Sequence, residues 1–234
     1  ADALQDVDLV GLARAHVTSG AVATLALRPD PDVDLYGPVG VDDAGRIRRL
    51  VNAFDDGGAT RKLMFTGVHV LDARSVQQLP DGVETCIIRQ GYAEVLRRGG
   101  HLQAHVHQGA FFDVGTPARW REAHTAVLEG AARGIVQRAG GVPGGPMVIT
   151  GARAHVAPSA VLEGPVVIRD GAHVEEGARV GPRVVVGAGA RVGRGATVAD
   201  TVLLPGARVE PATTARDAVL SADGTRLGWA PPAR

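Results

Sequence analysis

The feature that most constrains this chain is a strict six-residue repeat in its second half. Aliphatic residues stand six positions apart without a break, at Val156, Leu162, Ile168, Val174, Val180, Val186, Val192, Val198 and Leu204. Two residues before each of them the chain carries only alanine or valine, from Ala154 to Val202. A repeat of this period predicts a left-handed parallel β-helix, in which each hexad forms one side of a triangular coil and its aliphatic residue points inward. Nine hexads make three coils, near the minimum for a continuous core.

The repeat divides the chain into parts of different character. We expect an α/β domain over residues 1–135, a glycine- and proline-rich linker over 136–147, the β-helix over 148–220 and a tail over 221–234, with polar, frayed sequence from Asp217 onward. Before the linker, periodicity predicts strands near 21–27, 36–41, 46–51, 63–71, 101–107 and 110–114. It predicts helices near 6–19, capped by Asp6 or Asp8, and near 73–79, 84–98 and from Pro117.

Composition excludes some functional classes. The 25 basic and 25 acidic residues balance, so there is no bulk electrostatic signal for nucleic acid or an anionic membrane. No apolar run approaches the ~20 residues of a membrane span. A single cysteine, Cys86, cannot form an internal disulfide, which favours a reducing, cytoplasmic setting.

The segment from Phe111 to Pro117 has the pattern of a strand, a turn and a helix start. Thr116 can be the N-cap, and Pro117 suits the first helical position. Asp113 is therefore expected at the carboxyl end of a buried strand, where α/β sheets place their ligands. From the local sequence alone, the favoured interpretation is that Asp113 only helps to cap the helix.

Histidines offer two further candidates. The first helix is expected to bury one face, which carries Leu9, Leu12, Ala13, His16 and Val17. For His16, a packed, hydrogen-bonded core histidine is the favoured interpretation. His101, His105 and His107 alternate along a strand and could hold a metal. Because no cysteine or carboxylate joins them at matching spacing, a solvated strand face is favoured.

The chain resembles the sugar-1-phosphate nucleotidyltransferases, or nucleotide-sugar pyrophosphorylases, and most of all their mannose-1-phosphate guanylyltransferase-like and N-acetylmuramate-1-phosphate uridylyltransferase-like members. The resemblance rests on the hexapeptide repeat behind the segment Phe112-Asp113-Val114-Gly115-Thr116-Pro117, and on Tyr36-Gly37, Phe65-Thr66-Gly67-Val68 and the position of Asp2. It implies a partial Rossmann-like nucleotidyltransferase domain followed by a left-handed β-helix. It also implies a reaction in which a nucleoside triphosphate and a sugar 1-phosphate give a nucleotide-sugar and pyrophosphate.

The resemblance further implies which residues serve that reaction. Asp2 and Asp113 correspond to the two ligands of a Mg²⁺ ion, and no catalytic group beyond these metal ligands is expected. Substrate contacts are carried over to Gly37, Thr66, Gly67, Gly115 and Thr116. The exposed sides of the β-helix are expected to cover the first domain or to serve homo-oligomer formation.

Two departures from the family pattern limit the prediction. The family's glycine-rich nucleotide loop should stand well before Asp2, so we expect a truncated chain that is inactive alone and exposes an apolar face along Leu63 to Leu71. Asn52-Ala53-Phe54 replaces the Glu-Lys-Pro of many relatives, which leaves the sugar-phosphate contact unassigned. The sequence does not indicate which sugar or which base is used. Two alternatives stay open: a non-catalytic regulatory or assembly subunit, and a hexapeptide acyltransferase. The second is disfavoured because such enzymes use a histidine from an inserted loop, whereas His155 and His173 stand inside an uninterrupted ladder.

Overall fold

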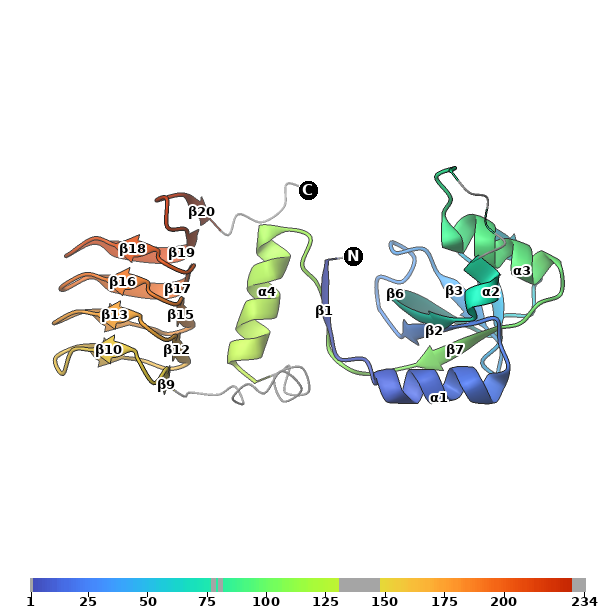
Figure 1. The fold of residues 1–234 in the computed structure, drawn as a ribbon, viewed down its shortest axis with the longest axis horizontal. Helices are drawn as coiled ribbons and strands as arrows, with labels where there is room; N and C mark the ends of the chain where they lie inside the picture. The colour runs from blue at the N-terminus through green and yellow to red at the C-terminus, as the bar shows by residue number, and fades with distance from the viewer. Residues whose placement is uncertain (1, 77–78, 80–81, 131–147, 229–234) are drawn as a thin grey trace. The chain divides into compact units, whose positions relative to one another are not determined.

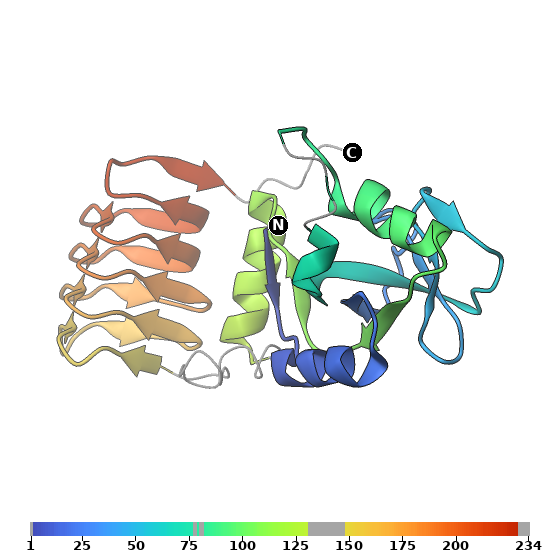
Figure 2. The same cartoon turned by 45° about the vertical axis from the view of Figure 1, so that its right-hand side comes forward.

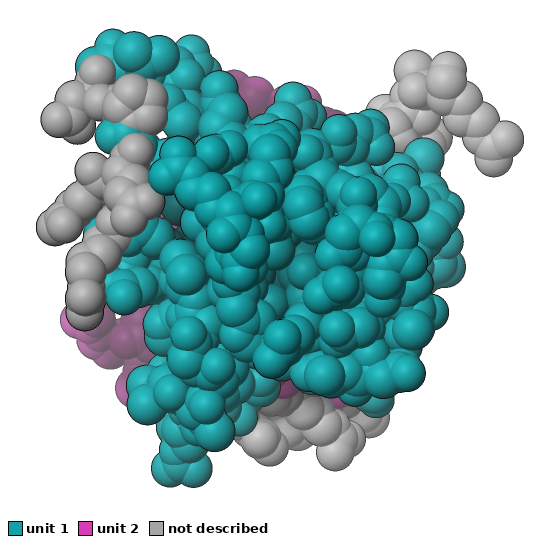
Figure 3. Space-filling model, turned by 90° about the vertical axis from the view of Figure 1, so that its right-hand side faces the viewer, with its two compact units in different colours: residues 1, 7–109 teal, residues 2–6, 110–234 magenta. Residues whose placement is uncertain are grey.

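The computed structural model describes residues 2–76, 79, 82–130 and 148–228 (Figure 1). It divides into two compact units, which Figure 3 colours separately and which we describe one at a time. Unit 1 comprises residues 1 and 7–109, and unit 2 comprises residues 2–6 and 110–234. The linker expected at 136–147 lies outside the described residues.

Unit 1 is built on a six-stranded sheet with the order β5-β4-β3-β6-β2-β7. Its strands are β2 (Ala23–Arg28), β3 (Val39–Val41), β4 (Ile47–Leu50), β5 (Phe54–Asp55), β6 (Arg61–Leu71) and β7 (Leu102–Val106). β2 and β7 run parallel, whereas the other neighbours are antiparallel. The hairpin predicted around residues 42–45 is confirmed as β3–β4. The expected Rossmann-like arrangement is not confirmed. Such a sheet is mostly parallel, whereas short connections such as this hairpin can join only antiparallel strands.

Helices pack on both faces of this sheet, as Figures 1 and 2 show. A π-helix, η1 (Ile87–Tyr92), runs into α3 (Ala93–Arg97), and both pack on the face that carries Leu25 and Leu27. On the other face, Leu12 of α1 (Leu9–Ser19) packs with Ala26, the residue between those two leucines. The short helix α2 (Ala73–Val76) follows β6. The predicted helix near 84–98 is therefore present but begins at Ile87.

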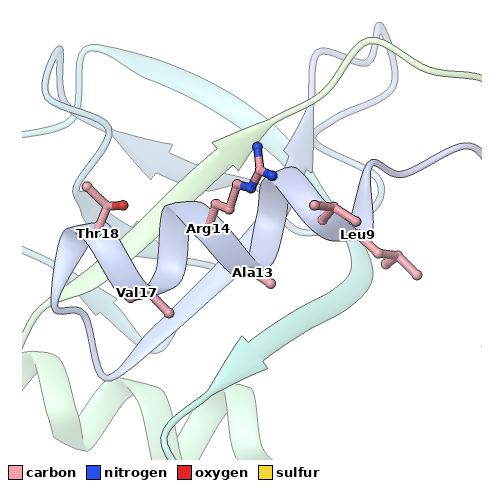
Figure 4. A pocket seen from close by; sticks show the side chains of 6 residues that line it. Leu9, Ala13, Arg14, Val17 and Thr18 are labelled. Carbon is pink, nitrogen blue, oxygen red and sulfur yellow. The ribbon is translucent and has the colours of Figure 1, made fainter.

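Helix α1 has the predicted ends but not the predicted buried face. Asp8 is its N-cap and accepts a hydrogen bond from the Gly11 N–H, and Gly20 ends it in the left-handed region. Leu12 is fully buried, but Leu9 and Val17 are 61% and 81% exposed. Their expected place on an inward face is wrong, because the sheet covers only the stripe through Leu12 and His16. Figure 4 shows Leu9, Ala13 and Val17 along the uncovered side of α1.

Strand β6 also differs from its prediction. Leu63 and Met64 are buried, Arg61 and Lys62 are exposed, and the residues from Val68 to Leu71 are half-buried. The expectation of an exposed apolar face along Leu63 to Leu71 is wrong, because the helix α1 covers Val68 and Val70.

Unit 2 contains a two-stranded ribbon, a helix and the β-helix. In the ribbon, β1 (Ala3–Gln5) pairs antiparallel with β8 (Phe111–Asp113), and α4 (Pro117–Leu128) follows. The coil strands are β9 (Val148–Thr150), β10 (His155–Val156), β11 (Val161–Leu162), β12 (Val166–Ile168), β13 (His173–Val174), β14 (Arg179–Val180), β15 (Val184–Val186), β16 (Arg191–Val192), β17 (Thr197–Leu203), β18 (Arg208–Val209), β19 (Thr214–Leu220) and β20 (Arg226–Gly228). From β9 to β19 they stack in parallel on their neighbours in the next coil, so the predicted parallel β-helix is confirmed.

The core of the β-helix contains most of the predicted inward residues. Six are at most 1% exposed: Ile168, Val174, Val180, Val186, Val192 and Val198. Val156 and Leu162 in the first coil are half-buried, because the end of the stack covers them on one side only. The ninth prediction, Leu204, is wrong: Leu203 is fully buried in the core instead and pairs with Val186.

The shift to Leu203 arises at one corner. Between Val180 and Val184 the corner has three residues, but between Val198 and Thr201 it has two. Thr201 is buried, and its hydroxyl donates to the Ala199 carbonyl at 2.6 Å, which stabilises the shorter turn. The inward positions then continue in the new phase at Val209 and Ala215.

The frayed tail expected from Asp217 is also partly wrong. Residues up to Leu220 belong to β19, which pairs with β17, and β20 returns antiparallel beside β19. The polar sequence there reflects strand faces that lie on the surface, as Arg216 and Arg226 do, rather than the absence of a strand.

Candidate functional site

The segment around Asp113 has the predicted strand, turn and helix. Thr116 is the N-cap of α4, with its hydroxyl oxygen accepting from the Arg119 N–H at 3.3 Å, and Pro117 is the first helical residue. The Asp113 carboxylate accepts from the Gly115 N–H at 3.1 Å. Its other oxygen is paired with the guanidinium of Arg119. The expectation of a buried strand in an α/β sheet is wrong, because β8 is half-buried and pairs with β1 in a two-stranded ribbon.

Asp2 and Asp113 are brought onto neighbouring backbones, as the metal-site hypothesis requires. Ala3 pairs with Asp113 in the register of β1 and β8, and the Asp2 carbonyl accepts from the Val114 N–H at 2.7 Å. Because side chains alternate along a strand, this register points the two aspartates toward opposite faces if it extends to Asp2, which precedes β1. Among the described residues there is no group of three or more His, Cys, Asp or Glu that could hold a metal. These observations do not support a shared Mg²⁺ site, which stays a prediction.

The other predicted substrate contacts belong to unit 1. Thr66 and Gly67 lie at a bulge in β6, where three of its residues face the single residue Ala26 of β2. The Thr66 hydroxyl donates to the Ala26 carbonyl at 3.1 Å, and Gly67 has a φ of 87°, which strongly favours glycine. Bulges of this kind are frequent beside active sites. Gly37 also has a positive φ, of 80°, and a Cβ there would lie 3.0 Å from the Val51 side chain.

A cluster of aromatic side chains next to this bulge was not predicted. The rings of Phe65 and His69 are 5.8 Å apart, and the Tyr92 hydroxyl is hydrogen-bonded to His69 Nδ1 at 3.0 Å. Burial lowers the pKa of His69 and raises the pKa of Tyr92 to about 12. The alternation of Phe65, Gly67 and His69 on one face of the predicted strand is the signal that could have indicated it.

The histidine predictions have mixed outcomes. His16 is half-buried and hydrogen-bonded to the Thr24 hydroxyl at 3.1 Å, which confirms its structural role. His101 is hydrogen-bonded to Gln103 on the same strand face, whereas His107 is buried. His155 and His173 project from neighbouring coils with their rings 5.7 Å apart, on strands with no inserted loop between them.

The sequence did not predict how α4 meets the β-helix. Trp120 packs in a cluster with Val185, Val202, Val219 and Leu204 from the outer surface of one β-helix side. Arg121 lies 2.9 Å from Asp217, and Arg183 donates to Asp200 at 2.6 Å, which raises the pKa of Arg183. Figures 1 and 2 both show α4 lying beside this side of the stack. The apolar residues that face outward on this side of the β-helix could have indicated the contact with α4, because the outward positions on the other sides are mostly polar.

Parallel coils with an aliphatic residue at every sixth position define a hexapeptide-repeat β-helix protein. Residues 162–230 match the family model described as the GMPPB C-terminal domain, named after mannose-1-phosphate guanylyltransferase beta. The resemblance to sugar nucleotidyltransferases is thus confirmed for the β-helix part of the chain. Comparison with curated proteins gave no match. Asp2, Asp113 and the predicted substrate contacts all precede the matched residues. No helix among the described residues is long and apolar enough to span a membrane.

Proposed function

We propose that the protein is a sugar-1-phosphate nucleotidyltransferase, which joins a nucleoside triphosphate and a sugar 1-phosphate into a nucleotide-sugar and releases pyrophosphate. The observation that carries the proposal is the combination of a GMPPB-type β-helix with the Asp113 segment at the start of α4. The β-helix alone would also suit other hexapeptide proteins. The Asp113 segment narrows the choice to the nucleotidyltransferases, through the resemblance.

The chemistry asks few groups of the protein. Transfer at the α-phosphorus depends mainly on positioning and on neutralising the charge of the phosphates. Asp113 would hold the Mg²⁺ ion, joined by Asp2 if the Asp2 side chain turns to the face of Asp113. The ion supplies that charge neutralisation and takes one or two carboxylates beside phosphate oxygens. Thr66, Gly67 and Gly37 would contact the sugar-nucleotide, whose close approach suits backbone positions without side chains. Gly115 and Thr116 would orient Asp113, as the Gly115 hydrogen bond supports.

One observation favours a second candidate, the non-catalytic assembly subunit. Both oxygens of the Asp113 carboxylate already have partners, in Gly115 and Arg119. A metal ion would have to compete with the Arg119 guanidinium for the same carboxylate. An acyltransferase is supported less well, since His155 and His173 form part of an uninterrupted ladder.

The experiment that separates these candidates is a pyrophosphate-release assay. The protein, expressed from its complete gene, would be incubated with Mg²⁺, each of the common nucleoside triphosphates and a panel of hexose 1-phosphates. Turnover that requires both substrates supports the nucleotidyltransferase. A lack of turnover with every substrate pair, in a sample that stays folded, supports the assembly subunit. The proposal includes a cytoplasmic location, which the single cysteine, Cys86, favours.

A further inference from the structure

One corner of the β-helix is occupied by a column of charged residues. Arg183, Asp200 and Asp217 occupy this corner in successive coils, and all three have left-handed φ values, of 55°, 48° and 51°. Glycine fills most of the other left-handed corner positions, as Gly171, Gly189 and Gly206 do in one column. A non-glycine residue in this conformation costs about 1 kcal/mol or more. Aspartate tolerates this conformation better than most residues, so it is Arg183 above all that the turn does not explain.

These charged residues form ion pairs with residues of α4 and of its C-terminal end. Arg121 Nη2 lies 2.9 Å from Asp217 Oδ1 and 3.9 Å from Asp200 Oδ1. The Arg183 guanidinium donates a hydrogen bond to Asp200 at 2.6 Å and lies 3.8 Å from the carboxylate of Glu129, the residue after the helix. Cations and anions thus alternate across the contact, so each charge has an opposite charge beside it.

The side of the β-helix next to this corner is apolar on its outer surface. Its outward residues are Val167, Val185, Val202 and Val219. The corresponding residues of another side are His155, His173, Arg191 and Arg208. Val202 and Val219 are only 5% and 8% exposed, because Trp120 packs against them. The charged corner therefore lies at the edge of a buried apolar contact between α4 and the β-helix.

We propose that this corner is a docking site for α4 and that Arg121 is a positioning residue for the Asp113 segment. Residues two apart on a helix project about 200° apart. Arg119 accordingly pairs with Asp113 while Arg121 pairs with the β-helix. The start of α4 is therefore bound to Asp113 on one side and to the β-helix on the other. Through these contacts the β-helix sets the position of the Asp113 carboxylate. The consequence for turnover rests on the proposed function, whereas the docking itself does not.

The docking is tested by hydrogen exchange with mass spectrometry on the whole chain. In Arg121→Glu, a carboxylate would face Asp200 and Asp217, and we expect α4 amides to exchange about tenfold faster while the β-helix core is unchanged. Adding Asp217→Arg to that variant should restore slow exchange. The matched control is Arg194→Glu, which disrupts the 3.0 Å pair with Glu176 at a different corner and should leave α4 unchanged. Unchanged α4 exchange in Arg121→Glu, or no rescue by the swap, would overturn the docking.

Enzymatic turnover by the protein tests whether Arg121 positions the Asp113 segment. Arg121→Glu should lower kcat by about tenfold with KM changed less than about twofold, and the swap should recover it. If exchange responds and turnover does not, α4 docks but does not position the site, and the positioning role is wrong. If no variant, including the wild type, turns over any substrate pair while exchange responds, the proposed function fails and the docking stands.

Discussion

Arg121 on α4 and Asp217 on β19 form an ion pair of 2.9 Å between elements that are far apart in the sequence. An exposed pair of this kind contributes at most about 1 kcal/mol. The burial of Val202 and Val219 under Trp120 supplies the larger stabilisation, since apolar area removed from water contributes roughly 25 cal/mol per Å². The β-helix in this protein is therefore a stack with one side already covered by the chain's own helix.

Val180→Asp should destabilise the β-helix severely. Val180 is 1% exposed, so the new carboxylate would be buried without a partner, at a cost of several kcal/mol. The control is Arg179→Asp, which places the same residue on the exposed outer face one position earlier and should change stability by less than about 1 kcal/mol. Thermal unfolding followed by circular dichroism compares the two. Equal melting temperatures would contradict a packed interior.

Leu203→Ala and Leu204→Ala test the phase of the repeat after Val198. Leu203 is fully buried in the core, so its truncation should cost about 2–5 kcal/mol. Leu204 is half-buried at the outer cluster with Trp120, and its truncation should cost distinctly less. Urea denaturation of the two variants measures the difference. A larger loss for Leu204→Ala would mean that the six-residue phase continues unbroken.

Unit 2 should lose stability as the pH falls below about 6.5, through His124. His124 stacks on Trp120 at 5.3 Å, and its Nε2 is buried without a hydrogen-bond partner among the described residues. Burial lowers its pKa in the folded state, so the unfolded state binds more protons between that pKa and 6.5. The contribution is present above 6.5 and is lost as the pH falls through this window.

The measurement is urea denaturation at pH 7.5 and 5.0, followed by Trp120 fluorescence in a Trp229→Phe background. We expect the lower midpoint at pH 5.0. His124→Gln should reduce the difference between the two pH values, because glutamine does not titrate. A midpoint that is higher at pH 5.0, or an unchanged difference in His124→Gln, would contradict this role of burial.

The sequence predicted best where local rules and tertiary packing agree. The hexad residues from Ile168 to Val198 must all point inward, because the small residue two positions earlier permits each turn. Thr116 and Pro117 began a helix as expected, since capping depends on neighbouring residues alone. The same holds for Asp8 and Gly20 at the ends of α1.

Prediction failed where the outcome depends on contacts distant in sequence. Leu203 and Leu204 are both suitable core residues, and the choice between them depends on a corner shortened by one residue at Asp200. Val17 lies on a helix stripe that periodicity alone marks as apolar, yet the sheet does not reach it. The partners of Arg119 and Arg121 could not be predicted, because arginines on a helix surface are usually solvated.

The measurement that tests the central claim most directly is pyrophosphate release by the full gene product carrying Asp113→Asn. Asparagine keeps the shape of the side chain but removes the charge that Mg²⁺ requires, so we predict a loss of at least about 100-fold in kcat/KM. Asp170→Asn is the matched control, since Asp170 is also paired with an arginine, Arg153 at 3.5 Å, but lies in the β-helix. The account predicts near wild-type turnover for the control. Turnover by Asp113→Asn equal to that of the control would contradict a role for Asp113 in the reaction.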